Sequence, residues 1–172
     1  MDNRVSGDVD WQKTGPAGAT DRTYPLGYGP VLLDADGSKW IRPASGTMLF
    51  GIPNQPGNLR IELDEGGIST AAQATSVNQT FQLLASGKTI FAPITSGNPT
   101  AMSLSITTST GLFAGSFKLT DPKPGGAGMA TRSVKTSGIM VPHLRRGYGH
   151  FLLPELSTNP PVKSGSVVLR EP

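Results

Sequence analysis

Short segments in which apolar and polar residues alternate one by one recur along this chain, and they constrain its fold more than any other feature. In Asn58–Leu63 (NLRIEL) every second residue is Leu or Ile, and Met102–Thr107 (MSLSIT) repeats the pattern. A period of two places the apolar side chains on one face of an extended strand, whereas a helix would scatter them around its axis. Both segments are therefore predicted to be β-strands.

Turn residues divide the rest of the chain in the same manner. The 172 residues include 22 Gly and 15 Pro, which disfavour long helices. From Pro30 onward, short apolar runs are separated by turn residues every 8 to 12 positions or so, a spacing typical of sandwiches and barrels. We therefore predict a single all-β domain, a mainly antiparallel barrel or sandwich of about ten short strands. The expected strands are 31–33, 39–42, 58–63, 79–84, 89–93, 102–107, 112–119, 132–141, 149–153 and 165–170.

The connecting segments give further expectations. Residues 1–29 are polar and punctuated by Gly and Pro, so we expect an irregular lead-in of the same domain with at most one short strand, around Val9–Gln12. Residues 30–172 form the all-β part. The sequence DADG (Asp34–Gly37) predicts a hairpin turn, and DPKPGGAG (Asp121–Gly128) an exposed loop. Ile68–Val77 is the one segment in which a short helical turn is expected.

The alternation also selects the core. One apolar face runs through the predicted strands, and its side chains are expected to fill the interior of the domain. The expected core residues are Leu59, Ile61, Leu63, Phe81, Leu83, Met102, Leu104, Ile106, Phe113, Phe117, Met140, Leu152, Val167 and Leu169.

Composition excludes several classes of function. The net charge is only +3 and no run of four basic residues occurs, so nucleic-acid binding is not expected. No stretch of 18 apolar residues is present, and the opening MDNRVSGDVD lacks the apolar centre of a signal peptide, so membrane insertion is not expected. The absence of Cys excludes disulfides, thiolate metal sites and a cysteine nucleophile.

No catalytic constellation is evident. The only histidines are His143 and His150, and no G-x-S-x-G motif accompanies them. Glu62 and Asp64 share the polar face of one strand, where solvated carboxylates are the usual interpretation. We expect no catalytic residues and no cofactor.

Carboxylates spaced for metal binding are equally incomplete. Asp34 and Asp36, like Asp8 and Asp10, offer two hard ligands two residues apart, but the bidentate acid of a calcium loop does not follow. A hairpin turn explains Asp34 and Asp36 better than a calcium site does. We therefore predict no metal site, with Asp34 and Asp36 left as an open question.

Four residues are candidates for binding a ligand. Glycan recognition uses flat aromatic rings with polar neighbours, and Tyr28, Trp40 and Tyr148 could supply the rings. Arg146 belongs to the densest basic spot, Arg145-Arg146, and could meet an acidic glycan or a protein partner. Core packing is the competing interpretation for each ring.

Three segments together resemble a known kind of module. They are TGLFAGSFKLTDP (Thr110–Pro122), RSVKTSGIMVPHLRRGYGHFLLPEL (Arg132–Leu156) and SGSVVLRE (Ser164–Glu171). In this order they resemble an uncharacterised β-rich module at the C-terminal ends of large exported repeat proteins of environmental bacteria. The resemblance implies export and attachment to a longer parent chain. Its motifs are turn glycines and alternating strands, so it implies a fold and a location but no activity.

The leading expectation is thus a non-catalytic structural or adhesive module of a secreted or cell-surface bacterial protein. Its partners would be other proteins or further copies of itself, joined through unpaired strand edges. A carbohydrate-binding module is the first alternative. A small β-barrel hydrolase or lyase that uses His143, His150, Glu62 and Asp64 is the second.

Overall fold

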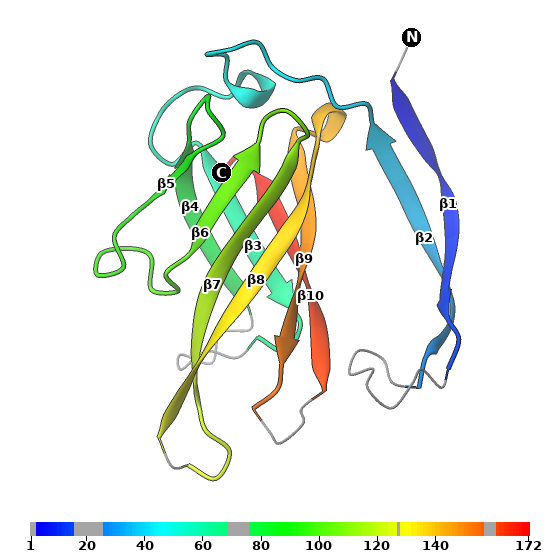
Figure 1. Cartoon of the computed structure of the whole chain (residues 1–172), viewed down its shortest axis with the longest axis vertical. Helices are drawn as coiled ribbons and strands as arrows, with labels where there is room; N and C mark the ends of the chain where they lie inside the picture. Colours follow the sequence, from blue (N-terminus) through cyan, green and yellow to red (C-terminus); the bar gives the residue numbers. More distant parts are fainter. Residues whose placement is uncertain (1–2, 16–25, 69–75, 127, 157–160) are drawn as a thin grey trace.

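An antiparallel barrel of eight strands forms most of this computed structural model, and a two-stranded hairpin stands beside it (Figure 1). The structure describes residues 3–15, 26–68, 76–126, 128–156 and 161–172. The hairpin pairs β1 (Arg4–Lys13) with β2 (Tyr28–Ser38). The barrel strands are β3 (Leu59–Glu65), β4 (Ser76–Leu83), β5 (Thr89–Phe91), β6 (Ser103–Thr107), β7 (Leu112–Pro122), β8 (Met129–Val141), β9 (Arg146–Pro154) and β10 (Val162–Arg170).

The predicted all-β class, antiparallel arrangement and strand number are confirmed, and of the two predicted architectures the barrel is the one found. Two short 3₁₀ turns, η1 (Leu49–Gly51) and η2 (Pro142–Leu144), complete the described elements. Among the described residues, no helix is long and apolar enough to span a membrane.

The eight-stranded sheet curls until its two end strands nearly meet. Its order is β5-β4-β3-β10-β9-β8-β7-β6. Lys88, just before β5, forms an isolated bridge with Ser105 of β6, and the Ile106 amide donates to the Gly87 carbonyl at 3.0 Å. The two ends of the sheet are therefore joined near β5 and β6, while Ser76–Thr80 of β4 and Phe117–Pro122 of β7 extend beyond this pairing.

The interior is filled by the side chains that the alternation selects. Every predicted core residue is buried except Leu152, whose side chain is 45% exposed while Phe151 and Leu153 are buried instead. That prediction was wrong because three apolar residues stand in a row at Phe151–Leu153, and such a run does not fix which of them points inward. An eight-stranded barrel is just wide enough for side chains to fill it, so no central channel is expected.

Inward-facing glycines make room for the largest rings. Gly165 of β10 pairs with Phe151 of β9, and the Phe151 ring lies over the position that a Gly165 side chain would occupy. Gly138 pairs with Gly149, and there the Phe113 ring takes the space. Glycine inside a strand is otherwise unfavourable, so these positions mark sites where close packing requires the absence of Cβ.

Three sequence predictions about the N-terminal part are wrong. The first 29 residues contain β1, a strand of ten residues, where an irregular lead-in with at most one short strand was expected. Strand β2 runs through Asp34–Gly37 without a turn, and Lys39–Arg42 is not a strand. The reason is pairing: β1 supplies ladder partners for Asp34 and Gly37, and tertiary pairing outweighs the weak local preference of Asp and Gly for turns.

Two other segments differ in detail. The predicted loop at Asp121–Gly128 begins later, because Asp121 and Pro122 end β7. Asp121 is buried and forms an ion pair with Arg132. The helical turn expected at Ile68–Val77 lies mostly outside the described residues, and Ser76 and Val77 open β4.

The packing of Phe151 against Gly165 gives a first prediction. An alanine Cβ at position 165 would lie 2.6 Å from Phe151 Cε2, so Gly165→Ala should lower the free energy of unfolding by about 2 kcal/mol, measured by urea denaturation. The loss should shrink in a Phe151→Leu background. Gly7→Ala, where no atom lies within 4 Å, serves as the control and should have little effect. An equal loss in both backgrounds would contradict this packing.

Candidate functional site

The four residues predicted to bind a ligand lie on three separate parts of the molecule. Tyr28 opens β2 of the hairpin, where its ring meets Trp11 edge-on at a centroid distance of 5.6 Å. Trp40 lies in the segment between the hairpin and the barrel. Arg146 and Tyr148 both point outward from β9. The structure therefore brings only Arg146 and Tyr148 together.

Trp40 is a packing residue in this arrangement. Its ring lies against Gly111 at the start of β7 and meets Phe50 edge-on at a centroid distance of 6.2 Å. The indole N–H donates to the Thr108 carbonyl at 3.0 Å. The ring is half-buried against the hydrophobic core, so it is not a free platform for a sugar ring.

Tyr148 lines an open groove on the outer wall of the barrel. Leu112, Ile139 and Tyr148 are consecutive cross-strand partners on β7, β8 and β9, and all three side chains are exposed. The groove has a volume of about 630 Å³. We call it the wall groove, and define it by the side chains Thr107, Leu112, Ser137, Ile139, Tyr148 and His150.

Arg146 lies at one flank of this groove, close to a cluster of ion pairs. Arg60 and Arg170 both approach the Glu62 carboxylate at 2.6 Å. The hydrogen bond from Arg170 is the main cause that lowers the pKa of Glu62, and the charge of Arg146 contributes in the same direction. Three arginines surround one carboxylate here, so this part of the wall is basic.

The hairpin has two chemically different faces. Opposite residues of an antiparallel pair share a face, so the register of β1 and β2 assigns each side chain. One face is apolar and consists of Val5, Gly7, Val9, Trp11, Val31, Leu33, Ala35 and Gly37. The other face is mainly acidic and consists of Arg4, Ser6, Asp8, Asp10, Leu32, Asp34, Asp36 and Ser38.

Both faces are open to solvent. Each residue from Arg4 to Gln12 is exposed, and Trp11 exposes 58% of its surface. In the part of the chain that the structure describes, neither β1 nor β2 pairs with a third strand. An isolated two-stranded hairpin is only marginally stable in water, so an apolar face of this kind favours a partner.

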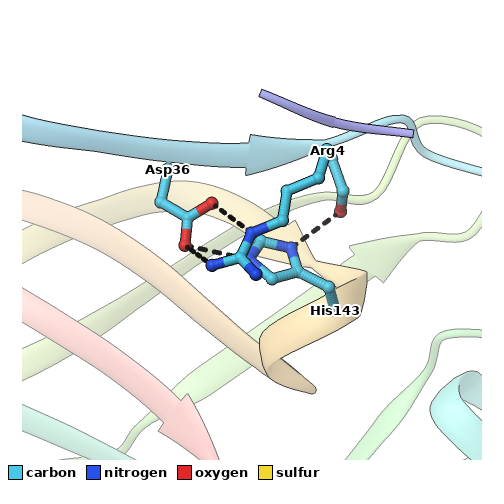
Figure 2. A network of polar contacts seen from close by, with 4 residues as sticks. Arg4, Asp36 and His143 are labelled. Atoms are coloured by element: carbon cyan, nitrogen blue, oxygen red, sulfur yellow. Dashed lines mark hydrogen bonds and ion pairs between the residues drawn. The ribbon is translucent and has the colours of Figure 1, made fainter. Parts of the chain in front are cut away.

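A polar network attaches the end of the hairpin to the barrel, and Figure 2 shows it from close by. Arg4 donates to both carboxylate oxygens of Asp36, from Nε at 3.2 Å and from Nη2 at 3.0 Å. His143 of η2 contacts the same carboxylate through Nε2 at 3.0 Å and the Ser38 hydroxyl through Nδ1 at 3.1 Å. We call these four residues the latch. They join the acidic face to the barrel, and the apolar face therefore points away.

The latch changes the ionisation of Asp36. Hydrogen bonds from Arg4, and then from His143, lower the pKa of Asp36 from 3.8 to about 2. The contact therefore favours the ionised carboxylate. Its contribution is complete above about pH 3.8 and is lost as the pH falls through about 2.

Little in the sequence indicates the latch. Asp36 and His143 are 107 positions apart, and only folding brings them together. The apolar hairpin face did leave a signal, because Val5, Gly7, Val9 and Trp11 alternate with polar residues. That alternation was hidden by the Gly and Asp residues around it.

The structure does not bring together His143, His150, Glu62 and Asp64, the four residues of the predicted hydrolase or lyase. His143 belongs to the latch, His150 to the wall groove, and Glu62 to the arginine cluster, while Asp64 lies farther along β3. Ser38, His143 and Asp36 follow the order hydroxyl, imidazole, carboxylate of a hydrolytic triad. Arg4, however, occupies both carboxylate oxygens and neutralises the charge that would stabilise an imidazolium, so the arrangement fits a structural ion pair.

Metal binding has no further support at Asp34 and Asp36. The Asp36 oxygens are engaged by Arg4 and His143. Within the described ranges, no group of three or more His, Asp or Glu side chains is placed to hold a metal ion.

Comparisons of the chain with protein-family models, with curated proteins and with solved structures found no match. The resemblance to a C-terminal module of exported repeat proteins therefore stays a prediction from the sequence.

The latch gives a prediction about pH. Arg4→Met should raise the pKa of Asp36 toward 3.8, and by more than His143→Gln does, because the Arg4 hydrogen bond is the larger cause. The Asp36 carboxyl signal in an NMR titration measures this. Asp36→Asn should also accelerate amide hydrogen exchange in β1 and β2 but not in β8 or β9, since it weakens the attachment of the hairpin.

Asp10→Asn is the matched control, because it removes a charge from the same hairpin face without affecting the latch. An Asp36 that titrates at its ordinary pKa in the unmodified chain would contradict the network.

Proposed function

We propose that this chain is a non-catalytic structural or adhesive module of a secreted or cell-surface bacterial protein, and that it joins copies of itself or other proteins through the β1–β2 hairpin. One observation carries the proposal: the barrel nearly closes on itself, whereas β1 and β2, in the described chain, each have a free edge along their whole length. Unpaired strand edges and exposed apolar strand faces are sites where protein chains associate.

The composition of the hairpin supports an interaction role. Several large apolar side chains on one exposed face of a hairpin are unfavourable in water unless another surface covers them. Val5 is 74% exposed and Trp11 is 58% exposed on the same face. Trp is among the residues that contribute most to binding at protein interfaces.

The sequence resemblance supports the cellular context. Modules at the ends of long exported chains are held close to many copies, where a weak contact is strengthened by high local concentration. The module therefore does not need tight affinity to hold such chains together.

Self-association is the expected result. The mass of the chain, measured by light scattering over a concentration series, should rise with concentration. Val9→Asp should weaken this association at least tenfold, because a charge would be buried on the apolar hairpin face. Ile90→Asp on β5 is the control, since Ile90 and Val9 are both 48% exposed. A strictly monomeric chain at every concentration would refute assembly through the hairpin.

A carbohydrate-binding module is the second candidate, and the position of Tyr148 favours it. The Tyr148 ring lines the wall groove beside the polar side chains of Thr107, Ser137 and His150. An open groove with one aromatic wall and several polar groups suits a sugar chain.

A glycan array tests this candidate. Binding of any glycan should fall at least tenfold in Tyr148→Ala, which removes the stacking surface from the groove. Tyr28→Ala, on the hairpin, should bind as the unmodified chain does. No binding to any glycan would eliminate the candidate.

A further inference from the structure

We propose that the apolar face of the hairpin from one copy docks into the wall groove of a second copy, with Trp11 as the anchor. The inference rests on the proposed function, and it names the surface that receives the hairpin. The two surfaces lie on different parts of the same chain, so the contact is head-to-tail and can repeat along an open row of copies.

The shapes and chemistry of the two surfaces are complementary. The hairpin offers a projecting apolar strip in which Trp11 lies opposite Val31, and Val9 lies opposite Leu33. The wall offers an apolar row, Leu112, Ile139 and Tyr148, that crosses three strands beside an open groove. Large aromatic anchors that fill a pocket dominate the energy of most interfaces.

The overall charges of the hairpin and the wall are also opposite, with the aspartates on the hairpin face that points away from the contact. The hairpin strands carry four aspartates against Arg4 and Lys13, a net charge of −2. On β7, β8 and β9 the outward-facing charged residues are Lys118, Lys135 and Arg146, and these three strands, as the structure describes them, direct no carboxylate outward. Opposite charge on two surfaces accelerates their encounter.

The same charges disfavour pairing between two hairpins. Within one hairpin Asp8 already lies directly opposite Asp34, an unfavourable placement of like charges. A second hairpin at the free edge would add another net charge of −2, whereas the basic wall reduces the repulsion. The wall is therefore the better partner for the hairpin than another hairpin is.

The latch explains why the hairpin does not fold onto its own barrel with this face. Asp36 and Ser38 project from the acidic face, and both contact His143 of the same chain. Opposite faces of a two-stranded sheet point in opposite directions, so the attachment through the acidic face turns the apolar strip away from the His143 contact. The strip is thereby presented to another molecule.

The small area limits the strength of the contact. A strand of ten residues is about 33 Å long, and a pair of strands is about 10 Å wide with its side chains, so the contact belongs to the weak, transient class of interfaces. Such a contact requires a high concentration of the chain, as in a crowded surface layer.

Mixing two complementary variants tests the inference. Trp11→Ser combined with Leu33→Ser disables the hairpin face, and Ile139→Glu disables the groove by placing a charged carboxylate where the apolar strip must dock. Sedimentation velocity at concentrations up to about 1 mM, where weak contacts are populated, measures association. Each variant alone should associate at least tenfold more weakly than the unmodified chain. A mixture of the two should form a one-to-one dimer that does not grow further, because each variant retains one functional surface.

Matched controls exist for both surfaces. Leu32→Ser alters the opposite face of the same hairpin, and Leu152→Glu adds a charge to the same outer wall of β9 outside the groove. Leu32 and Leu152 are both exposed. Both control variants should associate as the unmodified chain does.

Each other outcome contradicts the inference in a distinct way. If Ile139→Glu associates normally while the hairpin variant does not, the hairpin docks elsewhere and only the proposed function survives. If the unmodified chain never associates, the proposed function fails as well. If the mixture forms no dimer and the hairpin variant loses flotation with phosphatidylglycerol vesicles, the apolar hairpin face binds a lipid surface and not a second copy. If the mixture forms no dimer and Ile139→Glu loses binding of a glycan, the wall groove binds a sugar and not a second copy.

Discussion

The space inside an eight-stranded barrel is the constraint on which the rest of this structure depends. It is narrow enough that side chains must fill it. The rings of Phe113 and Phe151 fit because the residues beside them are glycines (Gly138, Gly149 and Gly165), which have no Cβ to overlap the rings. This packing lets the sheet curl until β5 and β6 nearly meet. With the ends of the sheet joined near β5 and β6, the hairpin is the one separate two-stranded sheet among the described residues.

A few polar contacts set the orientation of the hairpin relative to the barrel. Arg4, Asp36, Ser38 and His143 attach its acidic face to the barrel, so the apolar face is exposed by the same contacts that hold the strand pair in place. The protein thus joins a barrel that carries the wall groove to a two-stranded hairpin with one apolar and one mainly acidic face.

Several features could be predicted from the sequence, and the failures have specific physical causes. Strands such as Leu59–Glu65 were predictable because one face is buried and the other is wet, which produces strict alternation. Leu152 was assigned to the wrong face because its two neighbours are equally apolar. The turn predicted at Asp34–Gly37 is absent because β1 pairs with this segment, and pairing between distant segments leaves little trace in local composition. Trp40 was placed on a strand, but it lies in a connection and packs against Gly111.

The sequence by itself determined the all-β class, most of the barrel strands and most of the core, since these depend on the local period of apolar residues. Only the tertiary structure decided which residues meet. It separated Tyr28 and Trp40 from Tyr148, brought Asp36 to His143 across 107 positions, and created the wall groove from three neighbouring strands. The physical reason is that side-chain period is a local property of the chain, whereas barrel closure, register and the contacts between distant strands are set by how the whole interior packs.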